Sequence, residues 1–300
     1  MAAGSALAKI TISHLQAKKK DGHKISMLTA YDYPTALLQD RAGIDIVFVG
    51  DSVGTNILGY RSSQEVKMAD MLHHARAVRR GVESAFLLVD MPFMSYQVSV
   101  EAALSNAGRL VQEAGAEGVK LEGGTRILRQ IEAIVKAGIP VMGHLGFTPQ
   151  SQSHDLYLYS DRRGTVARVQ GKGPRGAASL IEEARRLQDA GIFGLVLEEV
   201  TEEVAQIVTR QLSIPVIGIG AGRYCDGQVL IVNDLIGLNE RKMRLAKSYA
   251  SWGESLAEIF STYRREVEQG LFPTADNAVH MEEDKFLKLQ ELLREREDKS

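Results

Sequence analysis

Short apolar segments that end in a charged or polar residue recur along this chain, and their spacing constrains the fold more than any other feature. Residues 44–54, I-D-I-V-F-V-G-D-S-V-G, are the plainest example. The β-branched and aromatic run from Ile46 to Val49 predicts a parallel strand that is covered on both faces. Asp51 and Ser52 follow directly, so we expect them at the carboxyl end of that strand, where parallel α/β folds build their sites.

Seven further segments have the same character, and helical patterns separate them. They cover residues 25–32, 86–90, 118–124, 139–146, 195–200, 214–222 and 228–234. About eight strands that alternate with helices along one uninterrupted chain are typical of an α/β (β/α)8 TIM barrel. A doubly wound open sheet remains an alternative, because the eighth segment is cramped.

The remaining segments predict how the barrel is extended. We expect an N-terminal helical segment at residues 10–18, a long last helix at 244–269 and an amphipathic helix at 282–296. The predicted domains are therefore one barrel over residues 1–280 and a charged helical tail over 281–300. Residues 148–173 form a polar stretch that is longer than most connections between elements, which favours a lid or a binding loop.

Composition excludes several classes of partner. The 300 residues carry a formal net charge of -2 at pH 7 and contain no basic stretch of the kind that binds nucleic acid. No apolar run approaches the roughly 20 residues of a membrane span, and we find no targeting signal at the amino end. The single cysteine, Cys225, excludes an internal disulfide and fits a reducing compartment. We therefore predict a cytoplasmic protein that binds neither nucleic acid nor membrane.

Charged side chains stand at or near the ends of several predicted strands. They are Asp51, Asp90, Lys120, Glu122, His144 and Glu198. Any one of them alone is more often a helix cap or a salt-bridge partner, but the strand ends of a barrel meet at one mouth. Alternation places Lys120 and Glu122 on the lumen side of their strand and turns Glu199 outward from its own.

Three of these carboxylates predict a metal site. Asp51, Asp90 and Glu122 would repel one another and take up protons unless a cation lay among them. Oxygen ligands on rigid positions suit a hard divalent ion such as Mg²⁺, which keeps positions open for water or substrate.

The segments that carry these residues resemble the ketopantoate hydroxymethyltransferase family, also called 3-methyl-2-oxobutanoate hydroxymethyltransferase. The matching motifs are V-G-D-S at 49–52, D-M-P-F at 90–93, V-K-L-E-G-G at 119–124, G-H-L-G-F-T-P-Q at 143–150, L-V-L-E at 195–198, and I-P-V-I-G-I-G-A-G at 214–222 with D-G-Q at 226–228. They occur in the expected order over most of the chain. The family lies in the phosphoenolpyruvate mutase and isocitrate lyase superfamily of barrels.

This resemblance implies an enzyme of pantothenate and coenzyme A biosynthesis. It would transfer a hydroxymethyl group from its co-substrate, 5,10-methylenetetrahydrofolate, to 3-methyl-2-oxobutanoate and give 2-dehydropantoate. The family's assembly implies a homo-oligomer, specifically a decamer.

The resemblance also implies a role for each site residue. The implied magnesium ligands are Asp51, Asp90 and Glu122, and Glu198 matches the proton acceptor. The implied substrate-binding set is Asp51, Ser52, Asp90, Lys120 and His144. Elementary chemistry agrees, because Mg²⁺ chelated by a 2-oxo acid stabilises the enolate, and a carboxylate across the barrel can act as general base.

Two segments depart from the family's pattern. Residues 63–67 read S-Q-E-V-K where a Thr-Leu-Pro-Val-Thr type segment is expected, and Arg168 stands where we expect a lysine. Both changes bear on the substrate mouth and so on which 2-oxo acid is used. Two alternatives stay open: a Mg²⁺-dependent carbon–carbon lyase or aldolase acting on another 2-oxo acid, and a catalytically idle barrel that serves as a scaffold. A requirement for methylenetetrahydrofolate would separate the transferase from the lyase.

Overall fold

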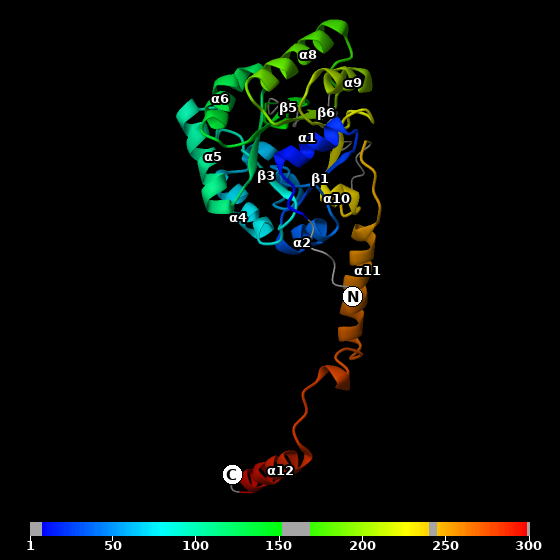
Figure 1. Cartoon of the computed structure of the whole chain (residues 1–300). Coiled ribbons are helices and arrows are strands. Elements are labelled where there is room, and N and C mark those ends of the chain that lie inside the picture. Colours follow the sequence, from blue (N-terminus) through cyan, green and yellow to red (C-terminus); the bar gives the residue numbers. More distant parts are fainter. Residues whose placement is uncertain (1–7, 152–168, 240–244, 299–300) are drawn as a thin grey trace. The chain divides into compact units, whose positions relative to one another are not determined.

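Eight parallel strands form a closed barrel in the computed structural model of this chain, which describes residues 8–151, 169–239 and 245–298 (Figure 1). The strands are β1 Ile25–Thr29, β2 Ile46–Val49, β3 Phe86–Asp90, β4 Gly118–Glu122, β5 Val141–Gly146, β6 Gly194–Glu198, β7 Val216–Ile219 and β8 Gly227–Leu230. Each strand pairs with the next one along the chain, and β8 pairs with β1. The predicted (β/α)8 barrel is therefore confirmed, and the doubly wound sheet is excluded.

Helices follow the strands and surround the barrel (Figure 1). The longer ones are α2 Tyr33–Arg41, α4 Met68–Arg79, α5 Val100–Ala114, α6 Leu128–Lys136, α8 Pro174–Asp189 and α9 Glu202–Gln211. The short ones are α3 Val53–Asn56 and α10 Val232–Leu235, with 3-10 turns η1 Ser63–Glu65, η2 Gly124–Ile127 and η3 Pro149–Ser151. In α5, the Ser99 hydroxyl accepts from the Ala102 amide at 3.1 Å, and Gly115 with a φ of 66° ends the helix.

Two apolar cores lie on opposite faces of the strands. One fills the lumen toward the amino ends of the strands, and its members include Leu15, Ile25, Met27, Ile46, Phe48, Phe86, Leu88, Met142, Val196, Ile217 and Val229. The other lies between the strands and the surrounding helices. Every residue of β2 and of β3 is buried, as expected for strands that are covered on both faces.

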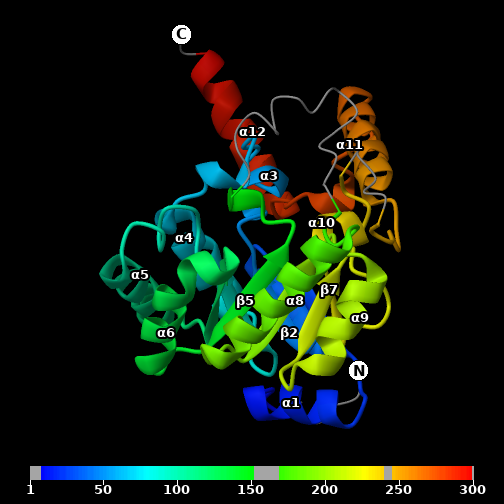
Figure 2. The same ribbon diagram turned by 90° about the horizontal axis from the view of Figure 1, so that it is seen from above.

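The helix α1 (Ile12–Lys20) lies across one end of the barrel, and α3 lies at the other end (Figure 2). The Leu15 side chain is 1% exposed and belongs to the lumen core. The ammonium groups of Lys18 and Lys19 form ion pairs with Asp45 and Asp226 at 2.5 and 2.6 Å. These contacts confirm the predicted N-terminal helical segment and give it a structural role, which is to close the barrel.

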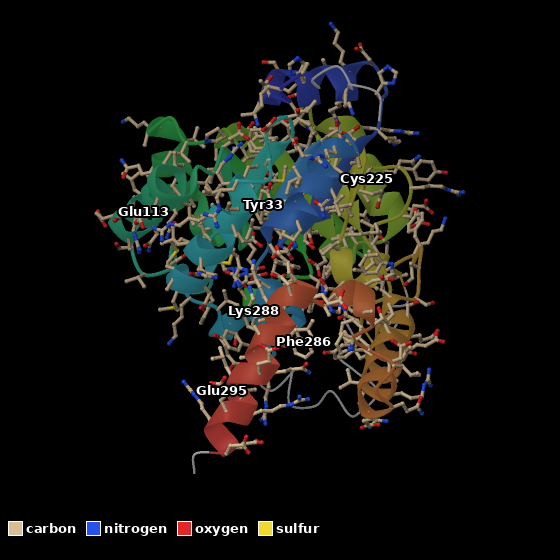
Figure 3. All side chains as sticks on the ribbon, turned by 90° about the horizontal axis from the view of Figure 1, so that it is seen from below. Tyr33, Glu113, Cys225, Phe286, Lys288 and Glu295 are labelled. Carbon is tan, nitrogen blue, oxygen red and sulfur yellow. The ribbon has the colours of Figure 1, made fainter. Side chains whose placement is uncertain are left out.

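The chain divides into two compact units, Met1–Ala250 and Ser251–Ser300. The second unit holds α11 (Trp252–Glu268), η4 (Ala275–Asn277) and α12 (Glu283–Glu297), which contain no buried residue. Figure 3 shows labelled side chains of α12 projecting from the helix. This division falls at residue 250, and the predicted domain boundary at residue 280 stays a prediction. The helix α11 also begins later than the predicted residue 244.

Most of the predicted lid, residues 152–168, lies outside the described residues, and so does Arg168. Among the residues that the structure does describe, no helix combines the length and the apolar character needed to cross a membrane.

Replacing Leu15 by alanine tests whether α1 is part of the barrel core. We expect Leu15→Ala to lower the free energy of unfolding by about 2–5 kcal/mol, because the substitution leaves a cavity in a packed lumen. Urea denaturation followed by circular dichroism measures the loss. Leu38 on α2 is 64% exposed, so the control Leu38→Ala should change stability by less than about 0.5 kcal/mol. Equal losses in the two variants would contradict this role of α1.

Candidate active site

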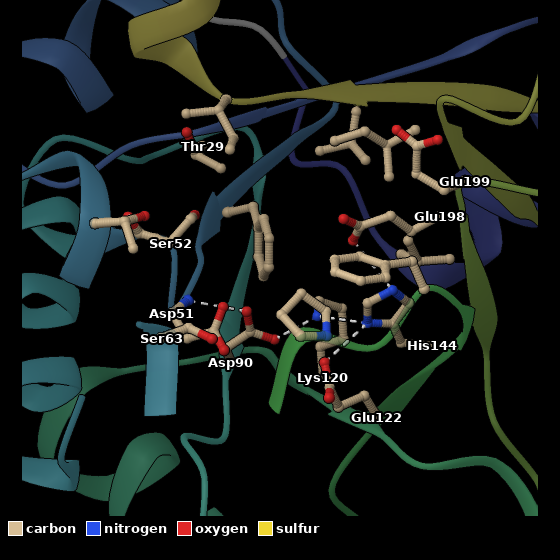
Figure 4. Close-up of a pocket in the computed structure, with 18 of the residues that line it drawn as sticks. Thr29, Asp51, Ser52, Ser63, Asp90, Lys120, Glu122, His144, Glu198 and Glu199 are labelled. Carbon is tan, nitrogen blue, oxygen red and sulfur yellow. Dashed lines mark hydrogen bonds and ion pairs between the residues drawn. The ribbon is translucent and has the colours of Figure 1, made fainter. Parts of the chain in front are cut away.

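A cavity of about 480 Å³ lies at the carboxyl ends of the barrel strands. All of the site residues predicted from the sequence line it: Asp51, Ser52, Asp90, Lys120, Glu122, His144 and Glu198 (Figure 4). These side chains come from the loop after β2, from β3, β4, β5 and β6. The expectation that the strand ends converge on one mouth is therefore confirmed.

The strand register explains why these charges meet. Asp90 of β3 lies level with Lys120 of β4, and Glu122 of β4 lies level with His144 of β5. Lys120 and Glu122 alternate with residues that pack under the helices, so both point into the lumen, as predicted. Their relative exposures are 7% and 4%. Burying charges this deeply costs several kcal/mol of folding free energy unless they are paired. The groups paired with Lys120 and Glu122 therefore determine which charges remain for a ligand.

Lys120 is the buried cation of this cluster. Its Nζ lies 2.7 Å from Asp90 Oδ1 and 5.2 Å from the centre of the Phe48 ring. Burial alone lowers the pKa of Lys120, but the carboxylates of Asp90, Asp51 and Glu122 outweigh burial and raise that pKa above its ordinary value. The side chain therefore remains an ammonium ion and offers positive charge to a bound anion.

Asp51 and Asp90 form a pair of neighbouring acids. The Asp51 backbone N–H donates to Asp90 Oδ2 at 3.0 Å, and the Gln150 amide donates to Asp51 Oδ2 at 2.9 Å. Burial raises the pKa of Asp51. Burial also raises the pKa of Asp90 to about 6, with Lys120 opposing the rise and Asp51 adding to it. A bound cation would favour the ionised forms of both acids.

His144 connects the two sides of the cavity (Figure 4). Its Nδ1 lies 3.5 Å from Glu122 Oε2, and its Nε2 lies 3.3 Å from Glu198 Oε2. Burial and Lys120 lower the pKa of His144, but the carboxylates of Glu122 and Glu198 raise it to about 9. An imidazolium ion thus pairs with both carboxylates at neutral pH. The Glu198 side chain is 24% exposed, whereas that of His144 is 3% exposed, so Glu198 faces the open part of the cavity.

Sequence reasoning assigned no individual role to three polar residues of the site. The Tyr31 hydroxyl lies 2.8 Å from the Ser52 hydroxyl and fixes it. Gln150 holds Asp51, although only its place at the end of the G-H-L-G-F-T-P-Q motif could have pointed to it. The buried Ser63 hydroxyl also lines the cavity, and among the described residues it has no hydrogen-bond partner. Such a hydroxyl costs about 1–3 kcal/mol, which points to a polar ligand in this wall.

Glu199 also lines the cavity, and this corrects the expectation that it points outward. Strand β6 ends at Glu198, and Glu199 has a φ of 49°, in the left-handed region. Alternation holds only while the backbone stays extended, so the turn brings the Glu199 side chain back to the mouth. Its carboxylate lies over Gly220, where an added Cβ would be 3.4 Å from Glu199 Oε1.

The acid groups suit a hard cation chemically but do not form a ready-made ion site. Among the described residues, no three His, Cys, Asp or Glu side chains are arranged so that they could hold a metal ion. Asp51 and Asp90 fit best, since they are adjacent oxygen donors with raised pKa values, and Asp90 is buried. The Glu122 carboxylate instead accepts from the Ser151 amide at 3.1 Å. The magnesium site at Asp51, Asp90 and Glu122 stays a prediction.

Comparison with known proteins gives one consistent result. The sequence pattern of the family described as ketopantoate hydroxymethyltransferase matches residues 9–275. The 3-methyl-2-oxobutanoate hydroxymethyltransferase of Clostridium kluyveri is 47% identical over 92% of this chain and 96% of its own length. The enzyme of the same name from Syntrophus aciditrophicus is 48% identical over 90% of this chain and 96% of its own.

A solved structure of 2,3-dimethylmalate lyase, described as a member of the PEP mutase/isocitrate lyase superfamily, shares the fold. It superposes with a TM-score of 0.56 over 96% of this chain and 98% of that one, at 14% sequence identity. At this identity the likeness concerns the fold alone.

Removing the Lys120 ammonium tests the charge balance of the cluster. We expect Lys120→Met to lower the free energy of unfolding by about 3 kcal/mol at pH 8, because buried carboxylates lose their cation. The loss should be smaller at pH 5. In the wild type the folded-state pKa of Asp90 already exceeds its ordinary 3.8, and in Lys120→Met it would rise further. The stability of the variant therefore falls as the pH rises from the unfolded-state pKa of Asp90 to its folded-state pKa.

Denaturation curves recorded from pH 5 to pH 8 measure this dependence. Lys9 provides the control, because its ion pair with Glu117 is partly exposed. Lys9→Met should cost less than about 1 kcal/mol at every pH. A loss in Lys120→Met that did not vary with pH would contradict the assigned charge balance.

Proposed function

Because the chain belongs to the ketopantoate hydroxymethyltransferase family, we propose that it transfers a hydroxymethyl group from 5,10-methylenetetrahydrofolate to 3-methyl-2-oxobutanoate. The product is 2-dehydropantoate, which serves pantothenate and coenzyme A biosynthesis. The observation that carries this proposal is the cavity in which a buried ammonium and a partly exposed carboxylate lie on opposite sides of His144. To form an enolate from a 2-oxo acid, an enzyme needs a positive group that binds the acid and a base that removes its proton. The ammonium and the carboxylate can fill these two roles.

Lys120 and Ser52 are proposed to bind the keto acid. The ammonium of Lys120 has three N–H donors, and Asp90 at 2.7 Å engages one of them. His144 Nδ1 lies 3.5 Å from the same Nζ, which leaves at least one donor for the substrate carboxylate. The Ser52 hydroxyl is held by Tyr31 at 2.8 Å and can donate to a substrate oxygen. His144, charged at neutral pH, adds a further positive group at 3.5 Å from the Lys120 Nζ.

Asp51 and Asp90 would hold the proposed Mg²⁺, with Glu122 as the third carboxylate of the predicted set. When bound, the ion supplies Lewis-acid stabilisation of the oxygen that becomes negative as the substrate loses a proton. The raised pKa values of Asp51 and Asp90 support this assignment, because they mark a place where negative charge lacks sufficient compensation.

Glu198 is the proposed general base. Its carboxylate faces the cavity, and the His144 imidazolium at 3.3 Å orients it. The proton on C3 of the keto acid passes to Glu198, and the electron pair of that C–H bond forms the enolate. The C3 carbon then bonds to the one-carbon unit of the donor, and the two bonds from that unit to N5 and N10 break. One water molecule supplies the hydroxyl group. The proton taken up by Glu198 and the remaining proton of the water pass to the two nitrogens, so that tetrahydrofolate and 2-dehydropantoate leave.

The lyase alternative has less support from this chain. Cys225 is 1% exposed, does not line the cavity, and has a pKa that burial raises above its ordinary value. A thiol in that setting is not an activated nucleophile. The scaffold alternative would leave several buried charges with no function to offset their cost.

The proposal extends to assembly and location. A homo-oligomer is supported by α11, which exposes large apolar side chains that a second copy could cover: Trp252, Ile259, Phe260, Tyr263 and Val267. The decamer of the family and a cytoplasmic location stay predictions.

Replacing Glu198 by glutamine tests the assigned base. In D₂O with 3-methyl-2-oxobutanoate and Mg²⁺, the wild type should exchange the C3 proton without any folate, which proton NMR follows. We expect Glu198→Gln to slow this exchange at least about 100-fold, while calorimetry shows unchanged keto-acid binding. The control Glu203→Gln alters an exposed acid on α9 and should exchange normally.

Two outcomes would count against the proposal. Normal exchange by Glu198→Gln would refute the base. Carbon–carbon bond chemistry by the wild type without methylenetetrahydrofolate would refute the transferase and favour the lyase.

A further inference from the structure

We propose that Arg61 binds the glutamyl carboxylates of the folate donor and thereby sets the direction in which the donor lies in the cavity. This inference rests on the proposed function and adds to it a residue that selects for one part of the donor.

The cavity is larger than the keto acid requires. Its volume of about 480 Å³ lies within the range of sites for cofactor-sized ligands, ~300–1,000 Å³, whereas 3-methyl-2-oxobutanoate has only five carbon atoms. The charged cluster accounts for one part of the lining. The rest of the wall includes Thr55, Tyr60, Arg61, Phe147, Pro149, Ile219 and Ile231. This part has the room and the mixed apolar and polar character that a flat heterocycle with an attached chain needs.

The backbone of Arg61 is fixed by a hydrogen bond, and its guanidinium group is left available for a ligand. The Glu65 carboxylate accepts from the backbone N–H groups of Arg61 and Ser62 at 2.8 and 3.0 Å, as part of the capping box of η1. The Arg61 residue is exposed. Within the described part of the chain its guanidinium forms no ion pair. An arginine on the lining of a cavity with no acidic partner is poised for an external carboxylate.

The other charges of the cavity favour one orientation of the donor. Five acidic side chains line it: Asp51, Asp90, Glu122, Glu198 and Glu199. Lys120 is engaged with Asp90, and His144 is paired with Glu122 and Glu198. The glutamyl end of the donor carries two carboxylates, which this acid-rich region repels. The aminopyrimidinone ring at the other end carries N–H donors, which the acids attract. The ring therefore enters first, and the carboxylates remain beside Arg61.

A second hollow provides space for a longer tail. It has a volume of about 730 Å³, shares Tyr60 with the first cavity, and is lined by Lys67 and by Glu65, whose carboxylate already accepts from two backbone N–H groups. A chain that leaves the first cavity beside Arg61 would thus meet another cation. The buried Ser63 hydroxyl, which has no hydrogen-bond partner within the described part of the chain, is on the same segment, as expected for a wall that receives a polar ligand.

Comparing two donors in wild type and Arg61→Gln tests the inference. One donor is 5,10-methylenetetrahydrofolate. The other, called the pteroate donor, is the methylamide of 5,10-methylenetetrahydropteroate, which has an uncharged amide in place of the glutamyl group. We expect Arg61→Gln to raise the KM for the folate donor about 5- to 20-fold, as for the loss of one charge-assisted contact. For the pteroate donor the KM should change less than about 1.5-fold, and kcat should be similar with both. Arg61→Lys should recover part of the loss, and added salt should weaken the effect.

Arg80 provides the matched control, because it is an exposed arginine at the end of α4 that lines neither hollow. Arg80→Gln should leave the KM values for both donors unchanged. An equal rise for both donors in Arg61→Gln, no rise for either, or a rise in the KM for the keto acid alone would overturn the role of Arg61. A wild-type protein that turned over neither donor would instead refute the proposed function, and this inference with it.

Discussion

The buried ammonium of Lys120 is the interaction on which the rest of the site depends. Its ion pair with Asp90 at 2.7 Å compensates part of the negative charge that Asp51, Asp90 and Glu122 bring into the lumen. Burial would otherwise drive these acids to take up protons, and a protonated acid neither attracts a cation nor orients a keto acid electrostatically. The Lys120 ammonium therefore opposes the rise that burial causes in the pKa of Asp51 and of Asp90, while an N–H donor remains for a substrate carboxylate.

The barrel makes this arrangement possible by dividing its lumen into two layers. Toward the amino ends of the strands, the inward positions carry apolar side chains, and Leu15 of α1 closes that end. Further along the same strands the inward positions carry charges, as in β4, where Lys120 and Glu122 lie two residues apart. The apolar layer supplies packing energy, and the rigid strands hold the charged layer in register. Packing in the apolar layer thus offsets the free-energy cost of burying the charges, and this layer takes no part in the chemistry.

The strands and the residues that reach the barrel mouth could be predicted from the sequence, because the alternation within each strand and the succession of strands can be read along the chain. The apolar run from Ile46 to Val49 and the alternation at Lys120 and Glu122 fix which residues reach the mouth of a barrel. The contacts among them could not be predicted, since Tyr31 on Ser52 and Gln150 on Asp51 join residues far apart in the chain. Glu199 escaped prediction for a different reason: its φ of 49° ends the alternation on which the expectation relied.

The central claim is that the keto acid and a divalent cation bind together at Asp51 and Asp90. Among the described residues, these carboxylates and Glu122 do not form a ready-made ion site, so the cation should bind more tightly when the keto acid is present. Titration with Mn²⁺, read by electron paramagnetic resonance with and without 3-methyl-2-oxobutanoate, tests this claim most directly. We predict that the keto acid tightens Mn²⁺ binding at least about tenfold, equivalent to ~1.4 kcal/mol. A Mn²⁺ affinity that is the same with and without the keto acid would contradict the account.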